Sequence, residues 1–160
     1  MSRIYTVSYQ GTITNAGGDT DLLELLPADD KPVKLRGFSL SQISEVGDAA
    51  EEGLRISILR LGATVTGGNG TATTPIPMDS ADAAAGVAAE CNGSTVATTS
   101  GTTVTLAEYG WNIRNSPYEM WFPDEDFAPG AVNAEGLFVR QVTTAADDYT
   151  GCFTFWVQED

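Results

Sequence analysis

Histidine is absent from this 160-residue chain, and basic residues are scarce. Without an imidazole the chain has no Ser/His/Asp or Cys/His nucleophile, no histidine zinc ligand and no histidine general base. Eight lysines and arginines stand against 22 aspartates and glutamates, which gives a formal net charge of −14. A field of that sign repels phosphate backbones and anionic headgroups, so we expect neither nucleic acid nor a membrane surface as a partner.

Cysteine and long apolar runs are also lacking. Cys91 and Cys152 fall in different expected strands, and the sequence leaves open whether they meet. Two buried thiols are the expectation for an intracellular product. No run of 18 apolar residues exists, and the start has no apolar core of signal-peptide length. We therefore expect neither a membrane span nor ordinary secretion.

What the chain does have is a core-forming composition with the spacing of strands. Apolar residues make up 42% of the chain, enough for one domain spanning 1–160. About nine or ten short β-rich stretches alternate with turn residues, and no long helical pattern occurs. This predicts an all-β fold, a single antiparallel β-sandwich of jelly-roll type. Residues 63–80 are rich in Gly, Thr and Pro and are expected to form a flexible surface excursion.

Basic residues gather in the middle of the sequence. Residues 33–42 and 54–61 both show the period of two that is typical of half-buried strands, and an acidic loop at 45–52 separates them. We expect these strands to lie centrally in one sheet that carries most of the positive charge and faces an acidic partner. Solvated strand faces are the plainer interpretation. The candidate partner-binding residues are Arg3, Lys34, Arg36, Arg55 and Arg60.

One glycine interrupts the alternation of the first of these strands. Val33 and Leu35 share one parity before Gly37, and Phe38 and Leu40 share the other parity after it. A bulge re-aims a strand in this way, so the pattern predicts a bulge at the glycine.

Acidic residues offer possible chemistry, but in patterns of low specificity. Four clusters deserve a test as calcium ligands: Asp19 with Asp21, Asp29 with Asp30, the triplet 124–126, and Asp147 with Asp148. None has the twelve-residue pattern of a calcium loop, so we interpret them as solvated turn residues and predict no metal and no cofactor. Glycoside hydrolysis needs two acids that face each other in a cleft, for which Glu90, Glu108 and Glu119 are the candidates on strands.

An aromatic-rich segment between residues 109 and 122 is a further candidate surface. Exposed in one plane, its rings would stack on a sugar or grip a protein, whereas burial is the commoner state of aromatic residues. The expected strand within 117–123 lies between two prolines, which suits a sheet edge. The candidate rings for glycan stacking are Tyr109, Trp111, Tyr118 and Trp121.

Four segments carry a resemblance to known proteins. The chain has Ile-Tyr-Thr-Val-Ser-Tyr at 4–9, Asp-Leu-Leu-Glu at 21–24 and Leu-Ser-Gln-Ile-Ser-Glu-Val-Gly-Asp-Ala-Ala-Glu-Glu-Gly-Leu-Arg-Ile at 40–56, and it ends on Gln-Glu-Asp. This pattern resembles a group of small proteins encoded among the structural genes of tailed bacteriophages. The resemblance covers nearly the whole chain, but it includes no catalytic motif and carries over no binding residue.

The resemblance implies a jelly-roll-like virion protein of the capsid decoration, or cement, type. Such a protein would be made in the host cytoplasm and would lie on the capsid exterior, with the major capsid protein as its partner. A homo-oligomer is expected, with a trimer as one form. Our first hypothesis is thus a non-enzymatic structural protein that reinforces a capsid. The alternatives are a carbohydrate-binding or host-adhesion module that uses exposed aromatics, and a hydrolase with paired carboxylates.

Overall fold

The part of the chain that the structure describes consists of strands and loops. This computed structural model describes residues 2–14, 18–45, 52–115, 117–142 and 147–160. Strands of four residues or more are β1 (Arg3–Ile13), β2 (Thr20–Leu26), β3 (Val33–Gln42), β4 (Gly53–Leu61), β8 (Ala88–Cys91), β10 (Thr103–Asn112), β11 (Tyr118–Trp121), β13 (Gly136–Gln141) and β14 (Tyr149–Glu159). The two-residue strands are β5 (Val65–Thr66), β6 (Thr71–Ala72), β7 (Ile76–Pro77), β9 (Thr98–Thr99) and β12 (Gly130–Ala131).

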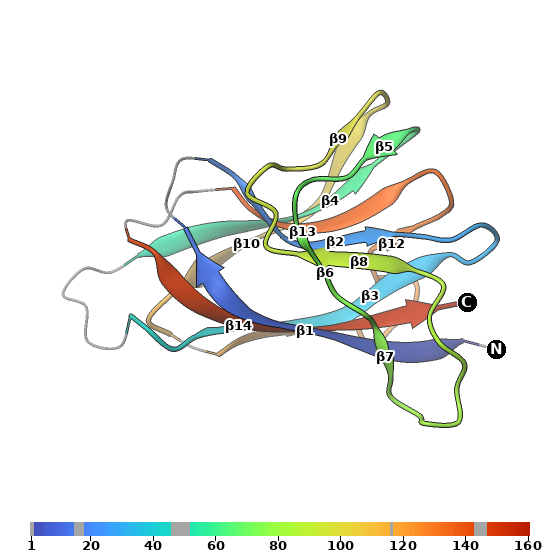
Figure 1. Ribbon diagram of the computed structural model, residues 1–160, viewed down its shortest axis with the longest axis horizontal. Helices are drawn as coiled ribbons and strands as arrows, with labels where there is room; N and C mark the ends of the chain where they lie inside the picture. Colours follow the sequence, from blue (N-terminus) through green and yellow to red (C-terminus); the bar gives the residue numbers. More distant parts are fainter. Residues whose placement is uncertain (1, 15–17, 46–51, 116, 143–146) are drawn as a thin grey trace.

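Two antiparallel sheets face each other as a sandwich (Figure 1). The first sheet has the order β7–β1–β14–β3–β11, with β12 also paired to β3, and the second has the order β6–β8–β2–β13–β4–β10. The long strands β1–β14–β3–β11 therefore oppose β2–β13–β4–β10, which is the strand order of a jelly roll. The prediction of a single all-β antiparallel sandwich is confirmed.

Alternate residues of both sheets fill the core, because successive side chains of a strand point to opposite faces. Side chains of β14 and β4 illustrate this: Phe153, Phe155 and Val157, with Leu54, Ile56 and Ile58. A smaller apolar cluster lies on the outer face of the second sheet and consists of Leu59, Leu61, Ala97 and Phe138. Both thiols are free, with Cys91 buried in β8 and Cys152 half-buried in β14, on different sheets.

The bulge predicted at Gly37 is present. Trp156 of β14 lies opposite Gly37 and the next residue, Val157, lies opposite Leu35, so Arg36 is the extra residue of β3. A side chain on Gly37 would place its Cβ 2.8 Å from the Met120 carbonyl oxygen and 2.8 Å from the Trp121 ring. Glycine is therefore required at the position of β3 that pairs with Trp121 of β11.

The prediction that one sheet carries the central basic residues is wrong. Strand β3, with Lys34 and Arg36, belongs to the first sheet, whereas β4, with Arg55 and Arg60, belongs to the second. Strands β1, β2, β3 and β4 alternate between the two sheets, so β3 and β4 lie on opposite sides of the sandwich. Strand β10 runs through the start of the aromatic-rich segment and has a bulge at Leu106. Of the expected turns, positions 15–17, 46–51 and 143–146 lie outside the described residues.

The connection between β4 and β10, residues 62–102, closes one side of the sandwich. Its strand β6 pairs with β8 of the second sheet and its strand β7 pairs with β1 of the first, while β5 and β9 form a separate two-stranded sheet that projects from the sandwich (Figure 1). The excursion expected at 63–80 belongs to this connection and does run over the surface, but it contributes strands to three sheets. We call residues 62–102 the long connection.

Replacement of Gly37 by alanine is expected to destabilise the fold by about 1–3 kcal/mol, because the new methyl group overlaps backbone and indole atoms. Gly53→Ala is the matched control. Its Cβ would meet no atom within 4 Å, so its free energy of unfolding should stay within about 0.5 kcal/mol of the parent or rise slightly. Urea denaturation measures both, and equal stability of the two variants would contradict the close approach at Gly37.

Candidate functional site

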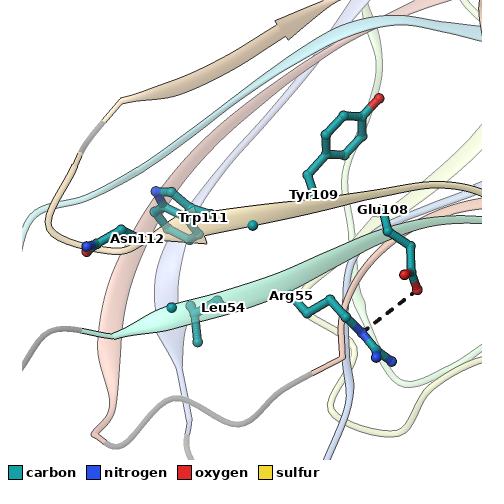
Figure 2. A pocket seen from close by; sticks show the side chains of 8 residues that line it. Leu54, Arg55, Glu108, Tyr109, Trp111 and Asn112 are labelled. Atoms are coloured by element: carbon teal, nitrogen blue, oxygen red, sulfur yellow. Dashed lines mark ion pairs between the residues drawn. The ribbon is translucent and has the colours of Figure 1, made fainter.

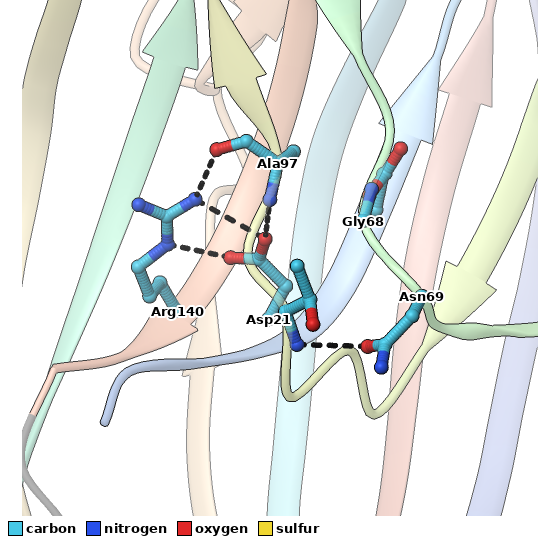
Figure 3. A network of polar contacts seen from close by, with 7 residues as sticks. Asp21, Gly68, Asn69, Ala97 and Arg140 are labelled. Carbon is cyan, nitrogen blue, oxygen red and sulfur yellow. Dashed lines mark hydrogen bonds and ion pairs between the residues drawn. The ribbon is translucent and has the colours of Figure 1, made fainter. Parts of the chain in front are cut away.

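Asp21 forms a buried ion pair and is not the solvated turn residue that the sequence suggested. Arg140 Nε donates to Asp21 Oδ1 (2.6 Å) and Arg140 Nη2 donates to Oδ2 (3.1 Å), as Figure 3 shows. Ala97 of the long connection donates its N–H to the same carboxylate (2.8 Å) and accepts from Arg140 (3.2 Å). Burial raises the pKa of Asp21, while the guanidinium and the amide oppose that shift. The carboxylate is 1% exposed, so it is held within the fold and closed to ligands.

Glu24 is a second buried carboxylate under the long connection. Its side chain is 3% exposed, its Oε2 accepts the N–H of Gly68 (3.1 Å), and its Oε1 has no hydrogen-bond partner among the described residues. A Cβ on Gly67 would lie 2.7 Å from Oε1, so glycine alone leaves room for this carboxylate. Burial raises the pKa of Glu24, and the charge of Glu90, its neighbour across the strands, raises it further.

The acids proposed for hydrolysis do not form a working pair. Glu90 lies on β8, Glu108 on β10 and Glu119 on β11, which are on separate strands of the two sheets. Glu90 does have a carboxylate neighbour in Glu24, but that partner is shut off from solvent and from any sugar. Within the described ranges, no group of three or more acids and cysteines is placed to hold a metal ion.

The five candidate basic residues each form an ion pair with an acid of the same chain. The N···O distances are Arg3–Asp82 3.5 Å, Lys34–Glu125 3.6 Å, Arg36–Glu125 3.5 Å, Arg55–Glu108 3.9 Å and Arg60–Glu135 4.0 Å. Only Lys34 and Arg36, both on β3, share an acid, whereas Arg3 lies on β1 and Arg55 and Arg60 lie at different positions of β4. These residues therefore make no common basic patch, and their role as coat contacts stays a prediction.

The four candidate aromatic rings do not share one exposed plane. Trp111 is 1% exposed and packs edge-to-face on Tyr149, with ring centroids 5.9 Å apart. Tyr109 and Tyr118 are half-buried against Phe38, at 5.9 and 6.2 Å. The remaining ring, Trp121, is half exposed on the outer face of the first sheet and lies over Trp156 with centroids 4.2 Å apart. The platform that glycan stacking requires is thus not assembled from these rings.

The side of the sandwich opposite the long connection is open. There β10 and β11 are the edge strands of the two sheets, and residues 122–132 run beside them. A hollow of about 460 Å³ lies there, with Leu106, Tyr109, Phe122 and Phe127 among its lining residues. Of the seven large apolar side chains exposed in the described part, four belong to these segments: Val104, Trp121, Phe127 and Val132, with Trp121 turned to the outer face of the first sheet. We call β10, β11 and residues 122–132 the open side.

Two of the predicted basic residues position this loop. Arg36 donates to the carbonyl oxygen of Pro123 (2.6 Å) and, with Lys34, neutralises Glu125. Phe127, two residues further on, is 79% exposed and is the most exposed large apolar side chain described. The sequence predicts a loop at 124–133. The only sequence signal for a binding surface there is a phenylalanine among acids and turn residues.

Comparison of the chain with protein-family models, with curated proteins and with solved structures found no match. In the described part of the chain, no helix is long and apolar enough to cross a membrane. The chemistry of the chain's own surface is therefore what bears on its function.

Glu24→Gln should remove a pH dependence from the stability of the protein. Folding raises the pKa of this carboxyl above its unfolded value of 4.5, so the folded state binds the proton more tightly. That contribution is complete below pH 4.5 and is lost as the pH rises through the folded pKa. The stability of the glutamine variant relative to the parent should thus increase with pH, by at most about 1.4 kcal/mol per pH unit. Denaturation between pH 4 and 8 measures it, and parallel curves would contradict the prediction.

Arg140→Met should cost about 3–5 kcal/mol of folding free energy, because it leaves the Asp21 carboxylate buried without its cation. Arg55→Met is the control at an exposed pair of 3.9 Å on the neighbouring strand, with an expected change within about 0.5 kcal/mol. Chemical denaturation of the two variants distinguishes them. A loss at Arg140 as small as that at Arg55 would mean that the buried pair does not support the fold.

Proposed function

We propose that this protein is a non-enzymatic virion structural protein that binds and reinforces the surface of a phage capsid through its open side. The observation that carries the proposal is the gathering of exposed apolar side chains on that side, among them Trp121 and Phe127. Exposed large apolar side chains gathered in one part of a soluble protein are typical of a protein–protein interface. Large aromatic side chains are also the residues that anchor such interfaces.

Charge around the open side fits a protein interface with an apolar centre and a polar rim. The acids of the 124–126 segment directly precede Phe127, and Lys34 and Arg36 form ion pairs with one of them, Glu125. The opposite side of the sandwich is covered by the long connection, so the molecule presents its two edges to a partner on one side only. A sandwich with a binding surface on one side suits a protein that lies on an assembled lattice. The resemblance to virion proteins names the coat as that partner, and a homo-oligomer such as a trimer on the lattice is part of the proposal.

Co-sedimentation with capsids that lack this protein tests the proposal. We expect saturable binding at a fixed ratio to the coat subunit, and the solution mass measured alongside tests for a homo-oligomer. Phe127→Ser should weaken binding at least tenfold, because it removes an aromatic anchor from the interface.

Ile76→Ser is the matched control, since Ile76 is also exposed but lies on β7, on the covered side. Its binding should equal that of the parent. Equal losses in the two variants would show that the open side is not the contact, and absence of binding by the parent would overturn the proposed function.

A further inference from the structure

In the described part of the chain the two six-stranded sheets have five outer strands, and four of them are protected against pairing with another chain, among them the two-residue β12. Strand β11 has four residues and lies between Pro117 and Pro123. Strand β7 has two residues, of which one is Pro77, and β6 has two residues. Short strands and prolines are the usual protection of sheet edges, because they leave few backbone groups for an incoming strand.

The fifth outer strand, β10, lacks this protection. It runs for ten residues without a proline and carries one charged side chain, Glu108, which is paired with Arg55. No described strand pairs with its outer edge. The single irregularity is the bulge at Leu106. A long uncharged edge strand is a template to which an extended segment adds through backbone hydrogen bonds.

A hollow beside this edge provides space for a side chain of such a segment. It measures about 660 Å³ and lies over Gly53 of β4 and Gly110 of β10. A Cβ at either glycine would meet no atom within 4 Å. Figure 2 shows Arg55 and Glu108 beside the hollow, joined by their ion pair, with Tyr109 pointing away from them. Bare glycine backbone next to an open edge can receive a bulky side chain from a neighbouring strand.

A second copy of this chain fits the edge poorly. Each copy carries a net charge of −14, so two copies repel each other. The bulge at Leu106 also shifts the alternation of β10, with Thr105 and Ala107 paired to consecutive residues of β4. A two-fold axis would match outward residues on one side of the bulge with inward residues on the other. A different chain is free of that constraint, and a basic one is attracted by the acidic field.

We propose that β10 receives an extended segment of the coat protein, which adds to the second sheet as a further strand, places a bulky side chain in the hollow over Gly110 and carries basic residues at its flanks. This inference rests on the proposed function and deepens it by naming the edge and the chemistry of the bound segment. Backbone hydrogen bonds supply affinity in this mode of binding, and the hollow supplies specificity.

Hydrogen exchange of the protein bound to capsids tests the inference. The amides of β10 that point away from β4 should gain protection on binding, whereas those bonded to β4 are protected in both states. Gly110→Trp should weaken capsid binding at least tenfold, because the indole occupies the hollow. Its fold is expected to persist, since the new side chain enters open space. Ala72→Trp is the matched control at the opposite edge of the same sheet, and it should bind like the parent.

The outcomes separate the two proposals. Saturable capsid binding without protection of β10, or with Gly110→Trp equal to the parent, overturns the docking edge and leaves the proposed function standing. Absence of binding by the parent overturns both. A solution mass of two copies that Gly110→Trp reduces to one would show that a second copy occupies the edge, and it would overturn the assignment to the coat protein.

Discussion

A carboxylate removed from water has to be neutralised or hydrogen-bonded, and this requirement at Asp21 determines much of the architecture. The cation comes from Arg140 on the neighbouring strand β13, and the capping N–H comes from Ala97 in the long connection. One side chain thus ties the pairing of two strands to the path of a distant loop. Glu159 acts in the same way on the opposite sheet, since it accepts the N–H groups of Gly86 (2.7 Å) and Val87 (2.8 Å).

These contacts explain why the molecule has one covered side and one open side. Polar residues of β1 add to them: Tyr5 donates to the carbonyl oxygen of Ala83, and Tyr9 accepts from the side-chain amide of Asn92. Together they draw the long connection over the strands β1 and β2. On the other side the inner gap between the sheets is bridged by the rings of Phe38, Tyr109 and Tyr118 instead, which leaves the edge strands themselves uncovered.

Local patterns in the sequence predicted local features well and long-range features poorly. The change of parity at Gly37 can be read from four nearby residues of the sequence, and the bulge is present there. The burial of Asp21 depends on Arg140, which is 119 residues away, so the spacing of acids alone assigned it to a solvated turn. The single basic sheet was wrong for a related reason, because alternation gives the faces of a strand but not the sheet to which it belongs. Trp111 could have been placed inside, since its parity between Gly110 and Asn112 matches the inward face of β10.

The strong acidity of the chain compensates for the exposed edge at β10, because it limits the pairing of copies there. A ten-residue edge with one charged side chain invites copies of the chain to pair with one another, and the other edges avoid this through proline or short length. At β10 such devices would also exclude the strand that we propose to bind there. A net charge of −14 repels other copies at a distance and needs no charged side chain on the edge beyond Glu108. At 0.1 M salt the field acts within about 10 Å, so it opposes the pairing of two copies through this edge, whereas it attracts a segment with basic flanks. The acidity therefore protects the edge selectively, against this chain and not against its partner.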